Sequence, residues 1–217
     1  VAQAMTGHTG IIATDHTYHG NTTAVQQLSR TNPPPGGYGG HVAFVPAPDS
    51  YRPLGGIAGE AHSLAFAAEV EKQIKVLEAS EFGFSGIMLC PFFANEGFPD
   101  LPNGWLDPAI AAVRRAGGIV IADEVQPGFG RLGTHFWGHE KIGFTPDVVT
   151  IGKPMANGHP VAAIITSSEI MGQFREGFRY FNTFGGNPVS TAAALATLKV
   201  VQEEGLMENA RVVGEYA

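Results

Sequence analysis

Ile119-Val120-Ile121-Ala122-Asp123-Glu124-Val125-Gln126 is the stretch that decides the fold of this chain. Four apolar residues follow a glycine pair and run directly into two carboxylates. A short apolar run bounded by turn-forming residues predicts a buried strand of a parallel sheet. Ligands of open α/β sheets bind at the carboxyl ends of the strands, so Asp123 and Glu124 lie where a ligand site is expected. A buried carboxylate is costly unless it is paired, and Asp123 therefore needs a cationic or hydrogen-bonding partner.

Further apolar runs predict that strands and helices alternate along the chain. Strands are expected at residues 10–14, 41–45, 85–90, 147–151 and 161–165. Helices are expected from a cap at Asn21 or Thr22 through residue 28, at 60–79, at 106–116, from 168, and at 188–204 with Gly205 as the C-cap. The alternation predicts an α/β fold in which flanking helices cover a mostly parallel sheet.

The composition excludes several classes of function. The chain has 13 basic and 20 acidic residues and a net charge of −7, and its basic residues form no stripe that could follow a nucleic-acid backbone. No apolar run reaches the roughly 18 residues of a membrane helix. The single cysteine, Cys90, cannot form an internal disulfide, and no signal-peptide pattern is present. We therefore predict a cytoplasmic protein that binds neither nucleic acid nor membranes.

Three polar features follow one another at even spacing. Lys153 lies 30 residues after Asp123 in a Gly-Lys-Pro turn, and Thr183 lies 30 residues further on, before Phe184-Gly185-Gly186-Asn187-Pro188. A lysine at a buried strand end favours the neutral, nucleophilic amine. The hydroxyl of Thr183 and the amides of a glycine turn before a helix suit an anion. An acid for a ring nitrogen, an amine for an aldehyde and a cup for a phosphate together describe pyridoxal phosphate.

Other polar residues favour structural roles. His135 and His139 are four residues apart, which is the spacing of a metal pair on a helix. Gly133 and Gly138 argue against a helix there and no third ligand is evident, so we predict no metal site. A hydrolase has little support, because no Gly-x-Ser-x-Gly nucleophile elbow is present.

Four segments point to a family. They are Tyr18-His19-Gly20, Asp123-Glu124-Val125-Gln126 with Gly128-Phe129-Gly130-Arg131, Gly152-Lys153-Pro154-Met155, and Asn182-Thr183-Phe184-Gly185-Gly186-Asn187-Pro188. In this order they resemble the class III pyridoxal-phosphate aminotransferases, which have the aspartate-aminotransferase fold (fold type I), and the resemblance covers essentially the whole chain. Within the class, the runs around Lys153 and Thr183 look most like the branch that holds alanine–glyoxylate aminotransferases and phospho-lyases of amino-alcohol phosphates such as phosphoethanolamine.

The resemblance implies roles for the residues at matching positions. Lys153 would hold pyridoxal 5'-phosphate as a Schiff base and then move a proton between substrate and cofactor. Asp123 would pair with the pyridinium nitrogen and keep it protonated. Val125 would pack on one face of the ring and Tyr18 would stack on the other. Gln126 would hydrogen-bond the ring hydroxyl.

The remaining matches complete the expected site. His19 and Gly20 would lie in the cofactor-binding segment, with His19 and Glu124 as support. Thr183 would reach the phosphate of the cofactor in the neighbouring subunit, so that a homodimer would share its sites.

The implied reaction is an aminotransferase cycle. In this ping-pong cycle an amino group moves from a small-molecule amino donor to a keto acid. Two alternatives stay open. One is a pyridoxal-phosphate lyase that eliminates phosphate from a phosphorylated amine, and the other is a non-catalytic α/β fragment.

The chain also departs from the family pattern. It lacks the Ser/Thr-Gly-Ser/Thr-Glu-Ala loop that cups the phosphate and the small domain that supplies an arginine for the substrate carboxylate. We therefore expect residues 1–217 to form part of the large cofactor-binding domain, incomplete at both ends, with residues 205–217 starting the connection to a small domain. Many relatives carry a glutamate where Cys90 stands, which leaves the choice of amino donor open.

Overall fold

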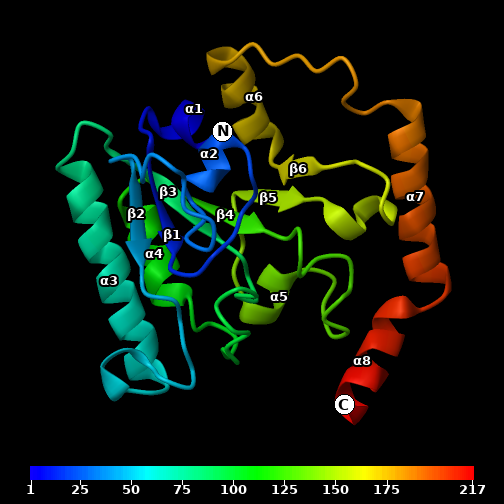
Figure 1. The fold of residues 1–217 in the computed structure, drawn as a ribbon, viewed down its shortest axis with the longest axis horizontal. Helices are drawn as coiled ribbons and strands as arrows, with labels where there is room; N and C mark the ends of the chain where they lie inside the picture. Colours follow the sequence, from blue (N-terminus) through cyan, green and yellow to red (C-terminus); the bar gives the residue numbers. More distant parts are fainter.

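A six-stranded sheet forms the centre of the computed structural model, which describes residues 1–217 (Figure 1). The spatial order of its strands is β2-β1-β3-β4-β5-β6. All neighbouring strands are parallel except the last pair, in which β6 runs antiparallel to β5. The predicted α/β fold with a mostly parallel sheet is confirmed. The strands are β1 (Gly10–Thr14), β2 (Val42–Val45), β3 (Phe84–Leu89), β4 (Ile119–Asp123), β5 (Val148–Ile151) and β6 (Ala163–Thr166).

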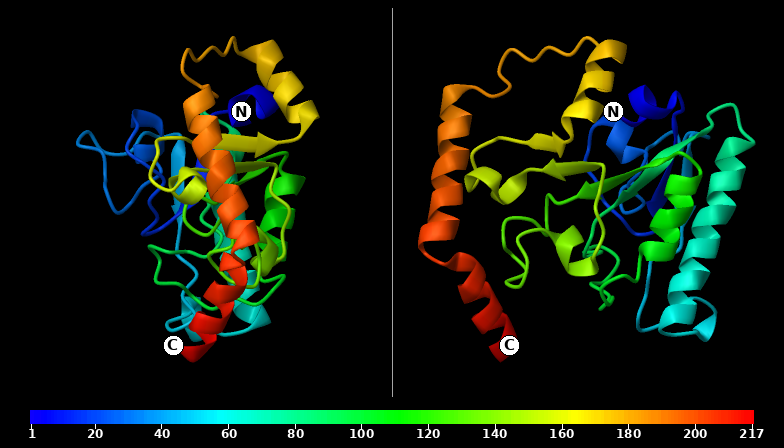
Figure 2. Two further views of the ribbon diagram at one scale, coloured as in Figure 1. Left: turned by 90° about the vertical axis from the view of Figure 1, so that its right-hand side faces the viewer. Right: turned by 180° about the vertical axis from the view of Figure 1, so that it is seen from behind.

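Helices flank the sheet unevenly. The long helices α3 and α4 pack against each other and cover one face of the sheet, whereas α2 and the loops around it lie on the other side (Figure 2). The chain then passes beyond β6 and ends in α7 and α8 at the edge of the molecule (Figure 1). The helices are α1 (Ala2–Thr6), α2 (Thr23–Gln26), α3 (Glu60–Glu78), α4 (Asp107–Arg115), α5 (Gly138–Ile142), α6 (Ser168–Gly177), α7 (Pro188–Glu203) and α8 (Leu206–Tyr216), with short 3-10 turns η1 (Leu54–Gly56) and η2 (Lys153–Ala156).

The main hydrophobic core lies between the sheet and the helices α3 and α4. Ile87 of β3 and Val120 of β4 pack there with Val70 of α3 and Val113 of α4, and all four are almost completely buried. Every residue of β3 is buried, as expected for a central strand that is covered on both faces. Gly86 allows β3 and β4 to approach closely, because a Cβ at this position would overlap the carbonyl oxygen of Ile119.

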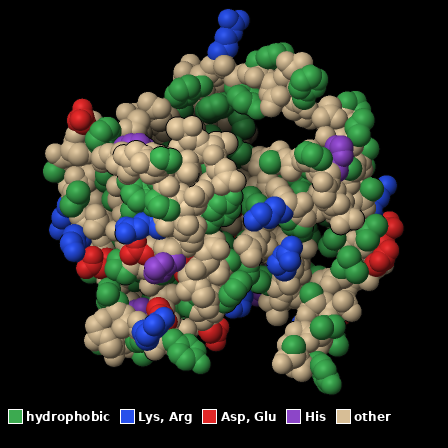
Figure 3. Space-filling view, viewed as in Figure 1, with side chains coloured by type: hydrophobic (Ala, Val, Ile, Leu, Met, Phe, Trp, Pro, Cys, Tyr) green, Lys and Arg blue, Asp and Glu red, His purple; other side chains and the backbone are tan.

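The outer surface is mixed in character. On the face seen in Figure 3, Lys and Arg side chains are scattered among Asp and Glu side chains. Hydrophobic side chains are exposed along the C-terminal helices, among them Leu195 and Val200 of α7 and Val213 of α8. No helix of the structure combines the length and the apolarity that crossing a bilayer requires.

Three local features differ from the sequence prediction. Helix α5 was expected to be a loop. This was wrong, because the buried side chain of Glu124 accepts hydrogen bonds from the first two amides of the helix. Helix α1 was not predicted. Gly205 does follow the helix that starts at Pro188, but its φ of 61° lets the chain turn directly into α8, for which it is the N-cap residue.

Candidate active site

A pocket opens at the carboxyl ends of β4 and β5, where a parallel sheet is expected to bind ligands. Four separate segments meet there: the loop after β1, the loop after β3, the end of β4 and the turn after β5. Seven of the eight cofactor-site residues predicted from the sequence line this pocket, and Cys90 and Asn95 complete it. The seven are Tyr18, His19, Gly20, Asp123, Val125, Gln126 and Lys153.

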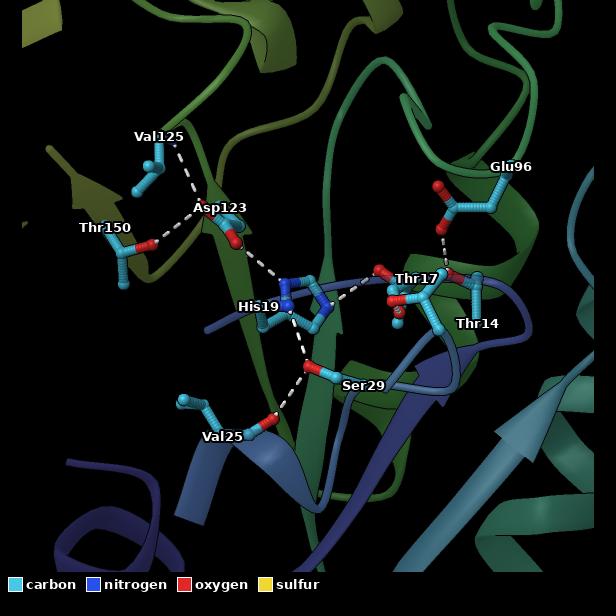
Figure 4. A network of polar contacts seen from close by, with 10 residues as sticks. Thr14, Thr17, His19, Val25, Ser29, Glu96, Asp123, Val125 and Thr150 are labelled. Carbon is cyan, nitrogen blue, oxygen red and sulfur yellow. Dashed lines mark hydrogen bonds and ion pairs between the residues drawn. The ribbon is translucent and has the colours of Figure 1, made fainter. Parts of the chain in front are cut away.

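Asp123 forms the buried floor of the pocket. Its Oδ2 lies 2.7 Å from Nδ1 of His19, and its Oδ1 accepts hydrogen bonds from the amide of Val125 at 3.1 Å and the hydroxyl of Thr150 at 3.4 Å (Figure 4). An ionised carboxylate only accepts hydrogen bonds, so the pairing with Asp123 assigns a proton to Nδ1 of His19. Within the protein, Asp123 is therefore paired with His19, a partner that was not predicted from the sequence; its expected pairing with a pyridinium nitrogen stays a prediction.

His19 is fixed from several sides. Its side chain is completely buried, and its Nε2 lies 3.1 Å from Oγ1 of Thr17. Its backbone amide donates to Oγ of Ser29 at 2.9 Å, and Ser29 in turn donates to the carbonyl oxygen of Val25 at 3.0 Å. These contacts determine the orientation of the imidazole, and through it the orientation of the Asp123 carboxylate.

Lys153 enters the pocket from the turn after β5. It begins η2 with a φ of 40°, a left-handed conformation that is unfavourable for a residue other than glycine. Backbone strain of this kind is often found at functional sites. No ion pair of the structure involves its amine. The expectation of a buried lysine was wrong, because the turn lifts Lys153 off the end of the strand and leaves it exposed at the side of the pocket.

The other lining residues complete the walls. The hydroxyl of Tyr18 donates to the side chain of Asn21 at 3.0 Å, which fixes the ring at the entrance. Cys90 is buried at the end of β3, and burial raises the pKa of its thiol to about 12. The thiol therefore stays neutral and contributes a small apolar surface to the pocket.

Thr183 is the one predicted site residue that lies outside this pocket. It is exposed in the segment between α6 and α7. In the same segment, Oδ1 of Asn182 accepts hydrogen bonds from the amides of Phe184 and Gly185. Of the three evenly spaced features, the structure thus brings Asp123 and Lys153 together and leaves Thr183 apart. Its contact with a neighbouring subunit stays a prediction.

Glu124 faces away from the pocket, although the sequence placed it near the site as support. Its side chain is completely buried, with Oε2 accepting from the amide of Gly138 and Oε1 accepting from the amide and Nδ1 of His139, all at 2.8 Å. Glu124 therefore caps the N-terminus of α5. This contact also explains why a helix forms in a segment that the glycines had marked as a loop.

Sequence reasoning missed a group of polar residues next to the pocket. Thr17 and Thr150 contact His19 and Asp123 directly, and Thr14 donates to the side chain of Glu96. Glu96 lies in the Pro- and Phe-rich loop after β3, and no spacing or motif distinguishes it. Only the fold shows that this loop returns to the end of β1.

Comparison with known families matches residues 1–217 to the aminotransferase class-III family. A Drosophila melanogaster protein named alanine–glyoxylate aminotransferase 2-like is 38% identical over 225 aligned residues, which cover 100% of this chain and 45% of the relative. The Caenorhabditis elegans ethanolamine-phosphate phospho-lyase homolog 1 is 34% identical over 232 residues, which cover 99% of this chain and 49% of the relative. The chain thus spans about half the length of these curated relatives. Two further relatives are named mitochondrial, so cytoplasmic localisation stays a prediction.

Solved structures give the same result. A phospholyase from Arthrobacter in complex with phosphoethanolamine superimposes with a TM-score of 0.92 at 40% identity, over 99% of this chain and 51% of that chain. An S-selective transaminase from Bacillus megaterium superimposes with a TM-score of 0.83 at 26% identity, over 99% of this chain and 50% of that chain. Together with the family match over its whole length, these relatives show that the chain belongs to the class III aminotransferases.

Proposed function

We propose that the full-length protein is a pyridoxal-phosphate-dependent aminotransferase that moves an amino group from an amino acid or amine to a keto acid. The observation that carries this proposal is the meeting of a free lysine amine, Lys153, and a buried carboxylate, Asp123, in one pocket. The class III family implies pyridoxal phosphate as the cofactor, and its members act on small amines.

The donor set of the pocket fits the ring of this cofactor. Asp123 lines the pocket with a carboxylate that is largely buried but keeps 8% of its side chain exposed after its contacts with the protein are made. Lys153 offers an amine that no acid neutralises, and Tyr18 and Val125 provide an aromatic and a branched side chain for the two faces of a planar ring. The predicted phosphate ligand Thr183 lies elsewhere, so the fit concerns the ring.

Pyridoxal phosphate supplies an aldehyde that amines attack and a ring that withdraws electrons from the substrate. Asp123 would hold a proton on the ring nitrogen, which increases that withdrawal. Lys153 Nζ would hold the cofactor and then carry a proton to and from the substrate carbon. Gln126 would donate to the ring hydroxyl. His19 and Gly20 would shape the wall of the pocket on the β1 side.

The homodimer is part of the proposal. Thr183 precedes a turn whose amides at Phe184 and Gly185 already gather around one acceptor, the side chain of Asn182. Its hydroxyl is exposed and available to a second subunit. We propose that it binds the phosphate of the cofactor held in the partner's pocket.

Covalent trapping tests the assignment. The full-length protein, incubated with pyridoxal phosphate and reduced with borohydride, is expected to carry the cofactor on one peptide, the one that contains Lys153. The Lys153→Ala variant should carry no label, whereas Lys199→Ala, which changes an exposed lysine of α7, should be labelled like the wild type. A wild-type protein that takes up no label, or a label on another lysine, would favour the non-catalytic alternative.

Elimination of phosphate from a phosphorylated amine is the second candidate. Two of the similar proteins reported above are named as phospho-lyases, one of them bound to phosphoethanolamine. Incubation with phosphoethanolamine in the absence of any keto acid separates the two reactions. An aminotransferase stops after one amino group per site, and sustained release of phosphate and ammonia would overturn our first proposal.

A further inference from the structure

A row of polar side chains continues from the pocket into the protein (Figure 4). Beyond Asp123 and His19 it reaches Thr17, whose Oγ1 is 3.1 Å from Nε2 of His19. Thr14 lies beside Thr17 in Figure 4 and donates a hydrogen bond of 2.6 Å to Oε1 of Glu96. Both threonines are completely buried. The row therefore leads from the carboxylate of the pocket toward a second carboxylate that is not in the pocket.

Glu96 occupies an unfavourable position for a charge. Its Oε2 is buried and has no hydrogen-bond partner. Burial raises the pKa of Glu96 above its usual value, while the hydrogen bond from Thr14 acts in the opposite direction. A buried carboxylate with an unsatisfied oxygen costs free energy. A group kept in such a position calls for a role other than stability.

The charges around His19 suggest this role. Asp123 lies on the Nδ1 side of His19, Lys153 lines the same pocket, and Glu96 lies beyond Thr17. The nearby Cys90 thiol is neutral because burial raises its pKa. If Asp123 pairs with a cationic ring nitrogen, a second cation at His19 needs a second anion to offset it. Glu96 supplies that anion, so that the charges alternate along the row.

We propose that Glu96 is a positioning residue of this site, whose buried carboxylate favours the doubly protonated form of His19 across Thr17. His19 in turn holds the Asp123 carboxylate toward the position of the ring nitrogen. The purpose of this arrangement rests on the proposed function. The test does not depend on that function, because the protonation state of His19 is measured in the protein without cofactor.

The substitution Glu96→Gln isolates the charge. Glutamine keeps the size of the side chain and an oxygen that accepts from Thr14, but carries no negative charge. In cofactor-free protein labelled with 15N-histidine, the imidazole signals of His19 are assigned by their absence in His19→Gln. At pH 7 the ratio of doubly to singly protonated His19 should fall about tenfold, which corresponds to about 1.4 kcal/mol.

Two matched variants serve as controls. Glu78→Gln removes an exposed carboxylate from the end of α3 and should leave the His19 signals unchanged. Glu96→Asp keeps the charge and should restore most of the wild-type ratio. An unchanged ratio in Glu96→Gln overturns the proposal.

Thr17→Val provides a second route if Glu96→Gln does not fold. It removes the hydroxyl between the two groups, and the same ratio should fall; an unchanged ratio again contradicts the role of Glu96. Titration of each folded variant with pyridoxal phosphate should show weaker binding than in the wild type. A wild type that binds no cofactor counts against the proposed function alone, since the signals of His19 decide the role of Glu96 independently.

Discussion

Two neighbouring carboxylates at the end of β4 serve two different regions of the molecule. Asp123 faces the pocket and keeps 8% of its side chain exposed, whereas Glu124 faces α5 and has none exposed. Asp123 is held by the side chains of His19 and Thr150 and by one backbone amide. Every partner of Glu124 belongs to the first two residues of α5.

The difference shows that neither the residue type nor the neighbouring position in the sequence determines what an acid does. Successive side chains at the end of a strand point to opposite sides, so two adjacent acids enter two different environments. Glu124 lies among protein donors with no access to a ligand, and it stabilises a helix terminus. Asp123 stays accessible from the pocket. The following substitutions separate the two regions, from the largest expected effect to the smallest.

Lys153→Ala tests the pocket side most strongly. Amine turnover with a keto acid should fall at least about 10³-fold, because the residue proposed to hold the cofactor and carry the proton is lost. The unfolding midpoint, followed by circular dichroism, should stay close to that of the wild type, since the side chain is exposed and unpaired. Lys199→Ala on α7 is the control and should leave both quantities unchanged. A Lys153→Ala protein with wild-type turnover would falsify the assignment.

Asp123→Asn should cut the rate of turnover by about 10²- to 10³-fold, because an amide cannot hold a proton on the ring nitrogen. The loss of unfolding free energy should be small, about 1–2 kcal/mol, because the amide oxygen still accepts from Val125 and Thr150 and only the charge of the contact with His19 is lost. Steady-state kinetics and urea denaturation measure the two effects. Asp100→Asn, at an exposed site, serves as the control. If Asp123→Asn lost more unfolding free energy than Glu124→Gln, the two acids would not differ in the way proposed.

Glu124→Gln should show the reverse pattern. The amide cannot accept from all three donors of Gly138 and His139, so the unfolding free energy in urea should fall by about 3 kcal/mol. Cofactor affinity should change little in the fraction that remains folded. Glu140→Gln also removes a carboxylate at the start of α5, but this one is exposed and accepts from one amide, so it should cost about 1 kcal/mol. A selective loss of cofactor binding in Glu124→Gln would place it in the pocket after all.

Glu96→Gln should have a smaller effect on stability, and the effect should depend on pH. Burial raises the pKa of Glu96 in the folded protein, so between its usual value and the raised value the folded state binds more protons than the unfolded state. The contribution of Glu96 to stability therefore falls as pH rises through this interval. Urea unfolding at pH 4.5 to 8 should show the variant gaining stability relative to the wild type as pH increases. A constant difference across this range would contradict the burial of the charge.

Most of the fold could be predicted from the sequence, for reasons that particular elements show. The β4 strand is a continuous apolar run because it is covered on both faces, and β3 is buried along its whole length for the same reason. Local patterns of this kind are strong signals. Helix α5 could not be predicted, because its first amides are satisfied by Glu124, which follows β4 and lies 14 residues before the helix, so that no local pattern links the two.

The candidate site also has features that could be predicted from the sequence and features that could not. The motifs around Tyr18, Asp123 and Lys153 are continuous in the sequence, and the carboxyl ends of neighbouring strands bring such motifs together at one edge of the sheet. The contact between His19 and Asp123 spans 104 residues, and the row to Glu96 depends on a loop with no regular structure. The exposure of Lys153 was also beyond prediction, since it follows from one unusual backbone angle.

The sequence by itself determined the class of fold, the family and the residues that face one pocket, because these depend on apolar runs and on motifs that are continuous along the chain. Only the tertiary structure decided which of two adjacent acids serves the pocket and which caps a helix. It also decided which histidine holds Asp123 and that Thr183 lies apart. The free energy of a buried polar group depends on the partners that surround it, and those partners come from distant parts of the chain.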